Sequence, residues 1–446
     1  MPSRDFLLIT DAVAPLGDGA SPIGAAGLSR ALASAGHRTT VLSLASAESA
    51  ARVPGLARRL RTVKATIGEE SHDVSLFEGR VTLSNAQLLV LGTEPRARAE
   101  TVALLAGAVK ALAADGLVSP EVTIGWGETA AAALSATSAS VRVFALPTGR
   151  LGPPLSSDEA RLLAPLLLDD DSASRSLVAL GSLAANAIIA PSPSAARATE
   201  TDPGLASRAS DEPFIPVRFG CDDPPHDPAS DPALPASYSA SALSGKAECR
   251  KAVARRCSLA LGPRTLLVSL GPLHRDEGAE SLLAGIERLA PFDVVTVILP
   301  RGDNDLVERA RLLAIQHPGR ISLLPGAEPG DERLARAAAD AMLLGDDHDR
   351  AGRAAALALL YGTLPIAPDI GANHDYLVDH DQRSSTGDAI LYSAATPFEI
   401  ESAVRRAIAL RSDGDSWSAL VRRLLQAAPR WSTTAAAVEE IAGQFG

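Results

Sequence analysis

The strongest constraint on the fold of this chain is the alternation of short aliphatic runs with longer segments rich in Ala, Leu and Arg. Runs such as residues 6–10 and 87–91 are too short for helices and end at polar or glycine residues, so they predict buried strands. Segments such as residues 22–35 and 98–114 have the length and composition of helices. The same reasoning predicts further strands at residues 38–44, near 122, at 141–145 and at 187–190. Strands that alternate with helices form parallel sheets covered by helices, so an α/β fold is predicted.

The alternation is interrupted between residues 211 and 244, where Pro, Asp and Ser crowd the sequence. It restarts beyond this segment, and three helical stretches follow Pro397. The predicted strands of this second half are residues 265–270, 294–299, 321–324, 341–344 and 364–367. We therefore predict two doubly wound, Rossmann-like domains, residues 1–245 and 246–446, that face a cleft. In such folds a ligand binds beyond the carboxyl ends of the strands.

Composition excludes several classes of function. With 42 Lys and Arg against 53 Asp and Glu, the net charge is −11, which repels nucleic acid and anionic membranes. Only 3% of the residues are aromatic, so few rings remain to stack on bases or sugars, while 46% hydrophobic residues are enough for aliphatic cores. We expect no nucleic-acid partner and no membrane partner.

The cysteines and the N-terminal sequence predict a cytoplasmic protein. Cys221, Cys249 and Cys257 are too few and too irregularly spaced for a disulfide framework or a CxxC zinc site. The N-terminal residues carry Asp5 and Asp11 around a short apolar run and lack the longer hydrophobic region of a signal peptide.

Several stretches resemble one family in order and spacing. The longest is the junction segment, residues 225–261, PHDPASDPALPASYSASALSGKAECRKAVARRCSLAL, which is similar to a family segment of the form WNPxxDxxLPxxYSxxxLxGKxxxK. Shorter ones are Leu28–His37 (LSRALASAGH), Ile188–Ser194 (IIAPSPS) and Leu360–Ile366 (LYGTLPI). Together they resemble the bacterial glycogen and plant starch synthases. The resemblance implies a two-domain GT-B fold and retaining glucosyl transfer from ADP-glucose to an α-1,4-glucan.

The resemblance also indicates where the donor-binding residues would stand. In the family's first glycine-rich loop a lysine corresponds to Gly17, and Asp18 and Gly19 follow it. An arginine and a lysine that grip the diphosphate correspond to Pro272 and Glu277. A charge-assisted hydrogen bond contributes about 1.5 to 3 kcal/mol, so losing both cations would weaken donor binding roughly 10² to 10⁴-fold.

Two loops keep part of the family's phosphate-binding chemistry. His274 and Arg275 lie beside the substituted positions and would supply a cation if that loop shifted register. In the phosphate loop that resembles TGGLxD, which is residues 370–375 here, Gly371 and Asp375 are retained. Gly19, Arg275, Gly371 and Asp375 are therefore the predicted remnants of the donor site.

The sugar-binding and catalytic positions are also altered. Residues 125–128 replace the family's HDWH motif, and Trp126 within them is a candidate sugar contact, with a role in the core as the alternative. The loop at residues 146–152 lacks the histidine of its family counterpart. Asp349 stands where the family has a glutamate that stabilises the transferred glucosyl group, so it is the one catalytic candidate.

Three histidines and three aspartates near these positions do not indicate a metal centre. They are His348, His374, His380, Asp346, Asp347 and Asp349. The histidines do not share one helical face, and the aspartates are explained by a solvated loop or by a helix N-terminus. The glycines of residues 17–24 do not fit GxGxxG, and no GxSxG is present. We expect no metal and no cofactor.

Two functional hypotheses stay open. In the first, the chain keeps the family scaffold, has lost efficient transfer, and acts as a binding, regulatory or partner protein, which the added anions at Asp18 and Glu277 favour. In the second, it is an active glycosyltransferase with an altered donor or acceptor, and Arg275, Arg350 or Arg353 binds the phosphates. A purely structural protein is a third reading. The implied partners are a nucleotide sugar, a glucan, another protein or a second copy.

Overall fold

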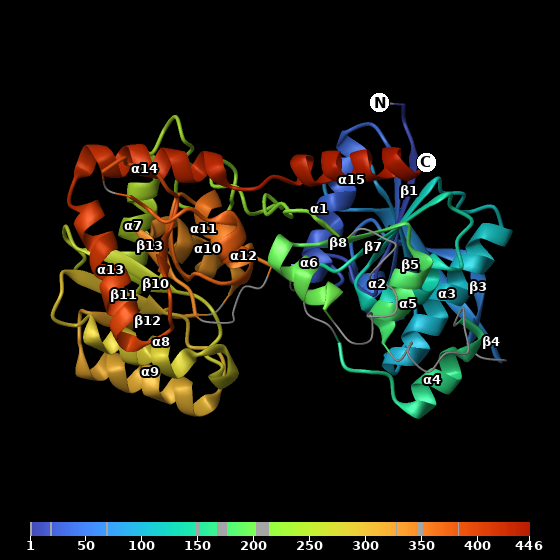
Figure 1. Cartoon of the computed structure of the whole chain (residues 1–446), viewed down its shortest axis with the longest axis horizontal. Helices are drawn as coiled ribbons and strands as arrows, with labels where there is room; N and C mark the ends of the chain where they lie inside the picture. The colour runs from blue at the N-terminus through green and yellow to red at the C-terminus, as the bar shows by residue number, and fades with distance from the viewer. Residues whose placement is uncertain are drawn as a thin grey trace. The chain divides into compact units, whose positions relative to one another are not determined.

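The computed structural model describes residues 2–17, 20–67, 70–148, 152–166, 176–201, 214–326, 328–345, 351–381 and 383–446. Contacts divide the chain into two compact units, which are described separately here (Figure 1). Unit 1 comprises Met1–Asp223 and Arg430–Gly446, and unit 2 comprises Pro224–Pro429. Each unit is built on its own sheet with helices packed against it, which confirms the predicted α/β class.

Within the described residues, unit 1 contains a nine-stranded sheet in the order β3-β4-β5-β2-β1-β6-β7-β8-β9. Its strands are β1 (Asp5–Ile9), β2 (Arg38–Ala45), β3 (Ala57–Ile67), β4 (Glu70–Arg80), β5 (Gln87–Gly92), β6 (Val122–Trp126), β7 (Val141–Ala145), β8 (Ala187–Ala190) and β9 (Phe214–Pro216). Its helices are α1 (Ala20–Ser34), α2 (Ala47–Arg52), α3 (Arg98–Ala114), α4 (Ser157–Leu163), α5 (Leu177–Ala184), α6 (Pro193–Glu200) and α15 (Trp431–Phe445), with short 3₁₀ turns at Glu128–Leu134 and Ala164–Leu166. The strand order reverses between β1 and β6, so the loops after these two strands flank the position where a ligand is expected.

Strand β1 shows why the short aliphatic runs form strands. Phe6 and Leu8 lie in one core cluster, whereas Leu7 and Ile9 lie in the other. Successive side chains of a strand point to opposite faces, so a strand covered on both faces must be apolar at every position. Helices α3 and α5 contribute to the cluster on one face, and α1 and α15 to the cluster on the other.

Within the described residues, unit 2 contains a six-stranded parallel sheet in the order β12-β11-β10-β13-β14-β15. Its strands are β10 (Thr265–Ser269), β11 (Val294–Ile298), β12 (Ile321–Leu323), β13 (Ala341–Leu343), β14 (Leu364–Pro368) and β15 (Ile390–Tyr392). Its helices are α7 (Ser244–Arg256), α8 (Ala279–Arg288), α9 (Asn304–Gln316), α10 (Pro329–Ala338), α11 (Arg353–Leu360), α12 (Gly371–Tyr376), α13 (Pro397–Arg411) and α14 (Gly414–Ala427). The order reverses between β10 and β13, and the loops after these strands flank the second expected ligand position.

The last helix, α15, packs beside α1 in unit 1 (Figure 1). Trp431, its first residue, stacks on Phe219 with ring centroids 6.2 Å apart and lies 6.3 Å from the ring of Trp126. The backbone N–H of Gly220 donates to Thr434 Oγ1 over 3.0 Å. These contacts place the end of the chain in unit 1.

The division by contacts differs from the predicted domains 1–245 and 246–446. Residues 224–245 lie in unit 2, where the hydroxyl of Tyr238 donates to the carbonyl oxygen of Tyr361 over 2.8 Å, and α15 returns to unit 1. A sequence pattern shows that a helix has an apolar face but not which core covers that face, so this return could not be read from the periodicity.

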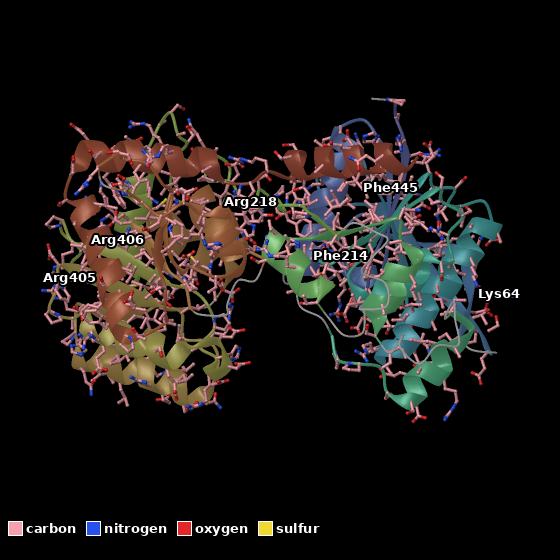
Figure 2. All side chains as sticks on the ribbon, in the orientation of Figure 1. Lys64, Phe214, Arg218, Arg405, Arg406 and Phe445 are labelled. Carbon is pink, nitrogen blue, oxygen red and sulfur yellow. The ribbon has the colours of Figure 1, made fainter. Side chains whose placement is uncertain are left out.

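The predicted strands are all found, and the three helical stretches expected after Pro397 are α13, α14 and α15. The hairpin β3–β4 was not predicted, because the first six residues of β3 are exposed and Arg58, Arg59 and Arg61 interrupt any apolar run. Lys64 marks this edge of unit 1 in Figure 2. No helix in the described part of the chain has the length and apolar character needed to cross a membrane.

Candidate functional site

The loop after β10 lies at the strand-order reversal of unit 2 and corresponds to the predicted diphosphate site. It is joined to the loop after β11: the N–H of Leu273 donates to Arg301 O over 2.7 Å, and the N–H of Asp303 donates to Leu273 O over 2.9 Å. The Asp303 carboxylate also accepts from the N–H of Arg275 over 2.9 Å and lies 3.0 Å from Nδ1 of His274. The two loops are thus fixed to each other by backbone and side chain.

Arg275, the predicted compensating cation, is engaged by carboxylates of its own unit. Its guanidinium forms ion pairs with Glu280 on α8 and Asp305 on α9. All three side chains are more than half exposed, at 58%, 51% and 62%, so these pairs add little to stability. A phosphate at this loop would therefore compete with two carboxylates for the same guanidinium.

The other groups of this loop do not replace the missing cations. Pro272 has no backbone N–H, so the loop lacks a hydrogen-bond donor there as well as a positive charge. A hydrogen bond with Asp303 raises the pKa of His274 above its ordinary value. The N–H of Arg275, followed by the His274 ring, lowers the pKa of Asp303. Any positive charge on His274 is thus balanced by the adjacent carboxylate.

Gly371 and Asp375, two predicted remnants of the phosphate loop, lie together on the short helix α12 after β14. Gly371 has φ +53°, in the left-handed region that favours glycine. His374, on the same helix, places Nδ1 2.8 Å from Oδ1 of Asp369. Asp349, the catalytic candidate, lies outside the described residues, and so do Arg350 and the aspartates at 346 and 347.

In unit 1, Trp126 ends β6 and is fully buried, with 0% of its surface exposed. Its indole N–H donates to Ser21 O over 2.9 Å, and its ring centroid lies 5.1 Å from that of Phe219. A Cβ on Gly24 would lie 2.8 Å from the indole ring, so α1 packs directly on it. This burial supports the core role that the sequence analysis sets against a sugar contact.

The loop after β1 is described as far as Gly17, the position of the family's lysine. A Cβ on Gly17 would lie 2.8 Å from Cβ of Ala12, so this backbone conformation leaves no room for a side chain there. Gly19 and Asp18, which the sequence analysis named in the same loop, lie outside the described residues.

Glu128 is a site residue that the sequence analysis named only as part of a motif. It follows Gly127, which has φ +87°, at the carboxyl end of β6. Its carboxylate accepts a hydrogen bond from the N–H of Gly152, and burial raises the pKa of Glu128 above its ordinary value. A partly buried carboxyl group at this end of a central strand is a candidate acid or base. The sequence signal that could have identified Glu128 is that it is a lone acidic residue in an alanine-rich stretch.

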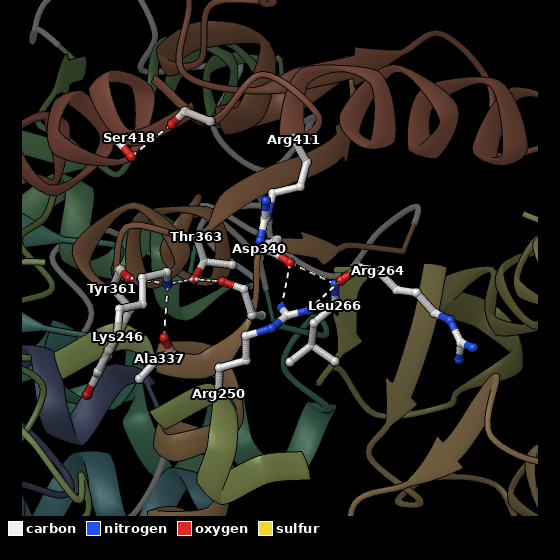
Figure 3. A network of polar contacts seen from close by, with 12 residues as sticks. Lys246, Arg250, Arg264, Leu266, Ala337, Asp340, Tyr361, Thr363, Arg411 and Ser418 are labelled. Atoms are coloured by element: carbon white, nitrogen blue, oxygen red, sulfur yellow. Dashed lines mark hydrogen bonds and ion pairs between the residues drawn. The ribbon is translucent and has the colours of Figure 1, made fainter. Parts of the chain in front are cut away.

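The segments that most resemble the family meet in a buried polar network of unit 2 (Figure 3). The ammonium group of Lys246, in the junction segment, donates to Ala337 O, Tyr361 O and Thr363 Oγ1 over 2.9, 3.0 and 3.1 Å. Its stem is partly exposed, but burial of the ammonium group lowers the pKa of Lys246 to about 8. Tyr361 and Thr363 belong to the LYGTLPI segment. Lys246 therefore holds these two segments to each other.

Asp340 forms the second half of this network (Figure 3). It is 5% exposed and accepts from Arg250 over 2.7 Å, from Arg411 over 2.9 Å and from the backbone N–H of Leu266 over 2.8 Å. Both carboxylate oxygens are bonded. The network thus joins α7, β10, α13 and the residue before β13.

A cationic centre surrounds His226, in the junction segment. Burial, followed by the charges of Arg336, Arg353 and Arg333, lowers the pKa of His226 to about 3, so its ring is neutral. Arg333 donates to both oxygens of Asp231, over 3.1 and 3.0 Å. Arg353 is the first residue of α11. The described residues contain no group of three or more His, Cys, Asp or Glu that could hold a metal ion.

Comparisons with known proteins agree with this architecture. No family model matches the chain. The glycogen synthase of Anaeromyxobacter sp. strain Fw109-5 is 31% identical over 269 residues, 58% of this chain and 56% of that protein. The glycogen synthase of Halorhodospira halophila is 29% identical over 263 residues, 58% of this chain and 55% of that protein. The chain thus spans about half the length of the curated relatives that it matches.

Solved structures show the same fold over the whole chain. The catalytic domain of starch synthase IV from Arabidopsis thaliana, bound to ADP and acarbose, superposes with a TM-score of 0.86 at 18% identity, covering 100% of this chain and 99% of that one. Sucrose-phosphate synthase from Thermosynechococcus elongatus superposes with a TM-score of 0.62 at 15% identity, covering 99% and 98%.

Two doubly wound sheets in succession, matched over their full length by these structures, define a protein of the GT-B glycosyltransferase fold. Over 58% of its length, the chain is also similar in sequence to a glycogen synthase, with 31% identity.

Proposed function

We propose that this chain is a glycogen- and starch-synthase-like protein that has lost efficient glucosyl transfer and acts as a binding or partner protein. The observation that carries the proposal is the loop after β10, where Pro272 and Glu277 stand at the cation positions and Arg275 is paired with two carboxylates. A unit negative charge about 4 Å from a phosphate opposes binding by roughly 1 to 4 kcal/mol at intermediate to high dielectric. Phosphate binding at this loop is therefore weak.

The ligand class follows from the structural neighbours. The starch synthase IV domain is bound to ADP and acarbose, and Anabaena Alr3699/HepE is bound to UDP. We therefore propose a nucleotide sugar or a glucan as the ligand, with weak binding of the nucleotide part. The protein partner, if the chain has one, would be a second copy or a related active enzyme. We further propose a reducing, cytoplasmic setting, because three irregularly spaced cysteines do not make a disulfide framework.

The test compares the natural chain with a double variant, Pro272→Arg with Glu277→Lys. The natural chain should show at most a small thermal shift with ADP-glucose or UDP-glucose, and no transfer of labelled glucose to a glucan primer. The double variant should gain a shift, because a ligand that binds the folded state stabilises it. The matched control, Pro272→Ala with Glu277→Gln, removes proline and anion without adding cations and should gain less. Transfer by the natural chain at ordinary enzyme rates contradicts the proposal.

The cationic centre around His226 favours a second candidate function, an active transferase with an altered donor. Arg353 begins α11, and its charge acts on His226 together with those of Arg333 and Arg336. If phosphates bind at this centre, a panel of nucleotide sugars should contain one that stabilises the natural chain, and Arg353→Gln should abolish that shift. The same shift in both proteins would exclude Arg353 from the donor site.

A further inference from the structure

A hollow on unit 2 lies outside the site described above. It has a volume of about 420 Å³, within the range of roughly 300 to 1,000 Å³ that small-molecule sites occupy. The end of α13, one side of α14, His380 and Ser385 form its walls. Helix α14 and its N-cap contribute residues 413, 416, 417, 420 and 423. This spacing places their side chains on one face of the helix.

His380 forms part of the wall and is 8% exposed. Its Nδ1 has no hydrogen-bond partner within the part of the chain that the structure describes. Burial, followed by the charge of Arg423 and that of Arg406, lowers the pKa of His380, so the ring is neutral at neutral pH. Figure 2 labels Arg406 on its helix. A buried polar atom without a partner is unfavourable, because it has lost its hydrogen bonds to water. Nδ1 of His380 is thus a buried polar atom for which the described residues supply no hydrogen bond.

Asp413 and Arg423 give the hollow one charge of each sign. Ser416 donates to Asp413 from its hydroxyl over 2.7 Å and from its N–H over 3.4 Å, and these bonds lower the pKa of Asp413 and keep it ionised. Arg423 donates to Gly387 O over 3.1 Å. Opposite charges on the same wall disfavour a ligand with a strong charge of either sign. Hydroxyl groups suit both, because a hydroxyl donates to a carboxylate and accepts from a guanidinium.

Apolar surface completes the hollow. Trp417 and Leu420, at 8% and 2% exposure, are among the residues that line it, and Trp417 is the tryptophan of unit 2, since Trp126 and Trp431 lie in unit 1. The Arg411 guanidinium lies 6.0 Å from the centroid of the Trp417 ring. A pyranose ring offers C–H faces that pack against an indole and hydroxyl groups around its edge. We propose that this hollow binds a neutral sugar unit, either as a free saccharide or as the end of a glucan chain. The choice of glucose as that unit rests on the proposed function.

The experiment uses the full chain and follows tryptophan fluorescence and calorimetry with glucose, maltose and maltoheptaose. Ala409 lies at the exposed mouth of the hollow, so Ala409→Trp fills it without disturbing the core. Ser402→Trp adds the same bulk at an exposed position of α13 outside the hollow. We expect Ala409→Trp to weaken sugar binding by at least about ten-fold and Ser402→Trp to leave it within about two-fold of the natural chain. Circular dichroism checks that both variants are folded.

The three sugars separate the two sources of the ligand. Equal binding of maltose and maltoheptaose indicates a free saccharide, and binding of maltoheptaose alone indicates a chain end. The inference is overturned if the natural chain binds none of the three, or if Ala409→Trp binds them as well as Ser402→Trp does. A parallel transfer assay with ADP-glucose keeps the two proposals apart, because turnover contradicts the proposed function and leaves the sugar site standing.

Discussion

Two regions of unit 2 differ in how their charged side chains are paired. In the buried network, Asp340 is bonded by Arg250, Arg411 and a backbone N–H, and the ammonium group of Lys246 is bonded by three oxygens. Around the loop after β10, carboxylates outnumber the groups that can be positive. The carboxylates are Asp276, Glu277, Glu280, Asp303 and Asp305, and the cationic groups are His274, Arg275 and Arg301, of which Arg301 is paired with Glu332.

The difference explains where the family resemblance is found. A change in the buried network leaves a polar group or a charge without its partner, so the fold constrains each residue there. A change in the exposed loop costs the fold little, because water screens the charges. The resemblance to the glycogen synthases is therefore evidence about the scaffold. A loop such as the one after β10 can diverge while the scaffold stays the same, so similarity of the scaffold does not establish a function for the loop.

The largest effect should follow from Asp340→Ala. The substitution leaves Arg250 and Arg411 without their carboxylate and the N–H of Leu266 without an acceptor. Removing one partner of a buried ion pair costs about 3 to 5 kcal/mol, so the free energy of unfolding should fall by that amount. Urea unfolding followed by circular dichroism measures it.

The matched control is Asp305→Ala, in the exposed loop region. Asp305 pairs with Arg275, and both side chains are more than half exposed, so the loss should be at most about 1 kcal/mol. If the two variants lose equal stability, the contrast between a constrained network and a tolerant loop is wrong.

A smaller effect, with a distinctive pH dependence, is expected for Lys246→Met. At neutral pH the loss should be about 1 to 3 kcal/mol, because the hydroxyl of Tyr238 also donates to the carbonyl oxygens of Ala337 and Tyr361. Burial lowers the pKa of Lys246 from 10.5 to about 8, so between these values the unfolded state binds more protons than the folded state. The free energy of unfolding of the natural chain should therefore rise as the pH rises through this window.

The Lys246→Met variant carries no proton at this position and provides the baseline. Unfolding of both proteins in urea, below pH 8 and close to pH 10.5, gives the difference. A difference that stays constant across the window would show that the ammonium group keeps its ordinary pKa and is not desolvated.

The fold was largely predictable because its signal is local. Every short aliphatic run became a strand, since a strand covered on both faces must be apolar throughout, as Phe6, Leu7, Leu8 and Ile9 show. The β3–β4 hairpin carries no such signal, because backbone pairing and not burial forms its first half. The return of α15 to unit 1 depends on contacts between Trp431 and residues more than two hundred positions earlier, which no local pattern records.

The candidate site was predictable only in its residue types. The sequence shows that cations are absent at residues 272 and 277, and His274 and Arg275 beside them suggest a replacement. It does not show that Glu280 and Asp305, from two different helices, bind the Arg275 guanidinium, because the pairing depends on tertiary structure. The burial of Trp126 likewise depends on α1 and on Phe219, which come from distant parts of the chain.

The smallest effect concerns His274 and tests whether the charges of the loop act locally. The hydrogen bond with Asp303 raises the pKa of His274, so the stability that this pair adds is fully present below the unfolded-state pKa. It is lost as the pH rises through the higher folded-state pKa.

Asp303→Asn should lower the pKa of His274 toward its ordinary value, as measured by NMR titration of the ring. It should change the free energy of unfolding less than either substitution in the buried network does. His274→Gln removes the titration and is the control. An unchanged pKa of His274 in Asp303→Asn would mean that Asp276 and Glu277 raise this pKa without Asp303. The proton on His274 would then be stabilised by several carboxylates and not by one ion pair.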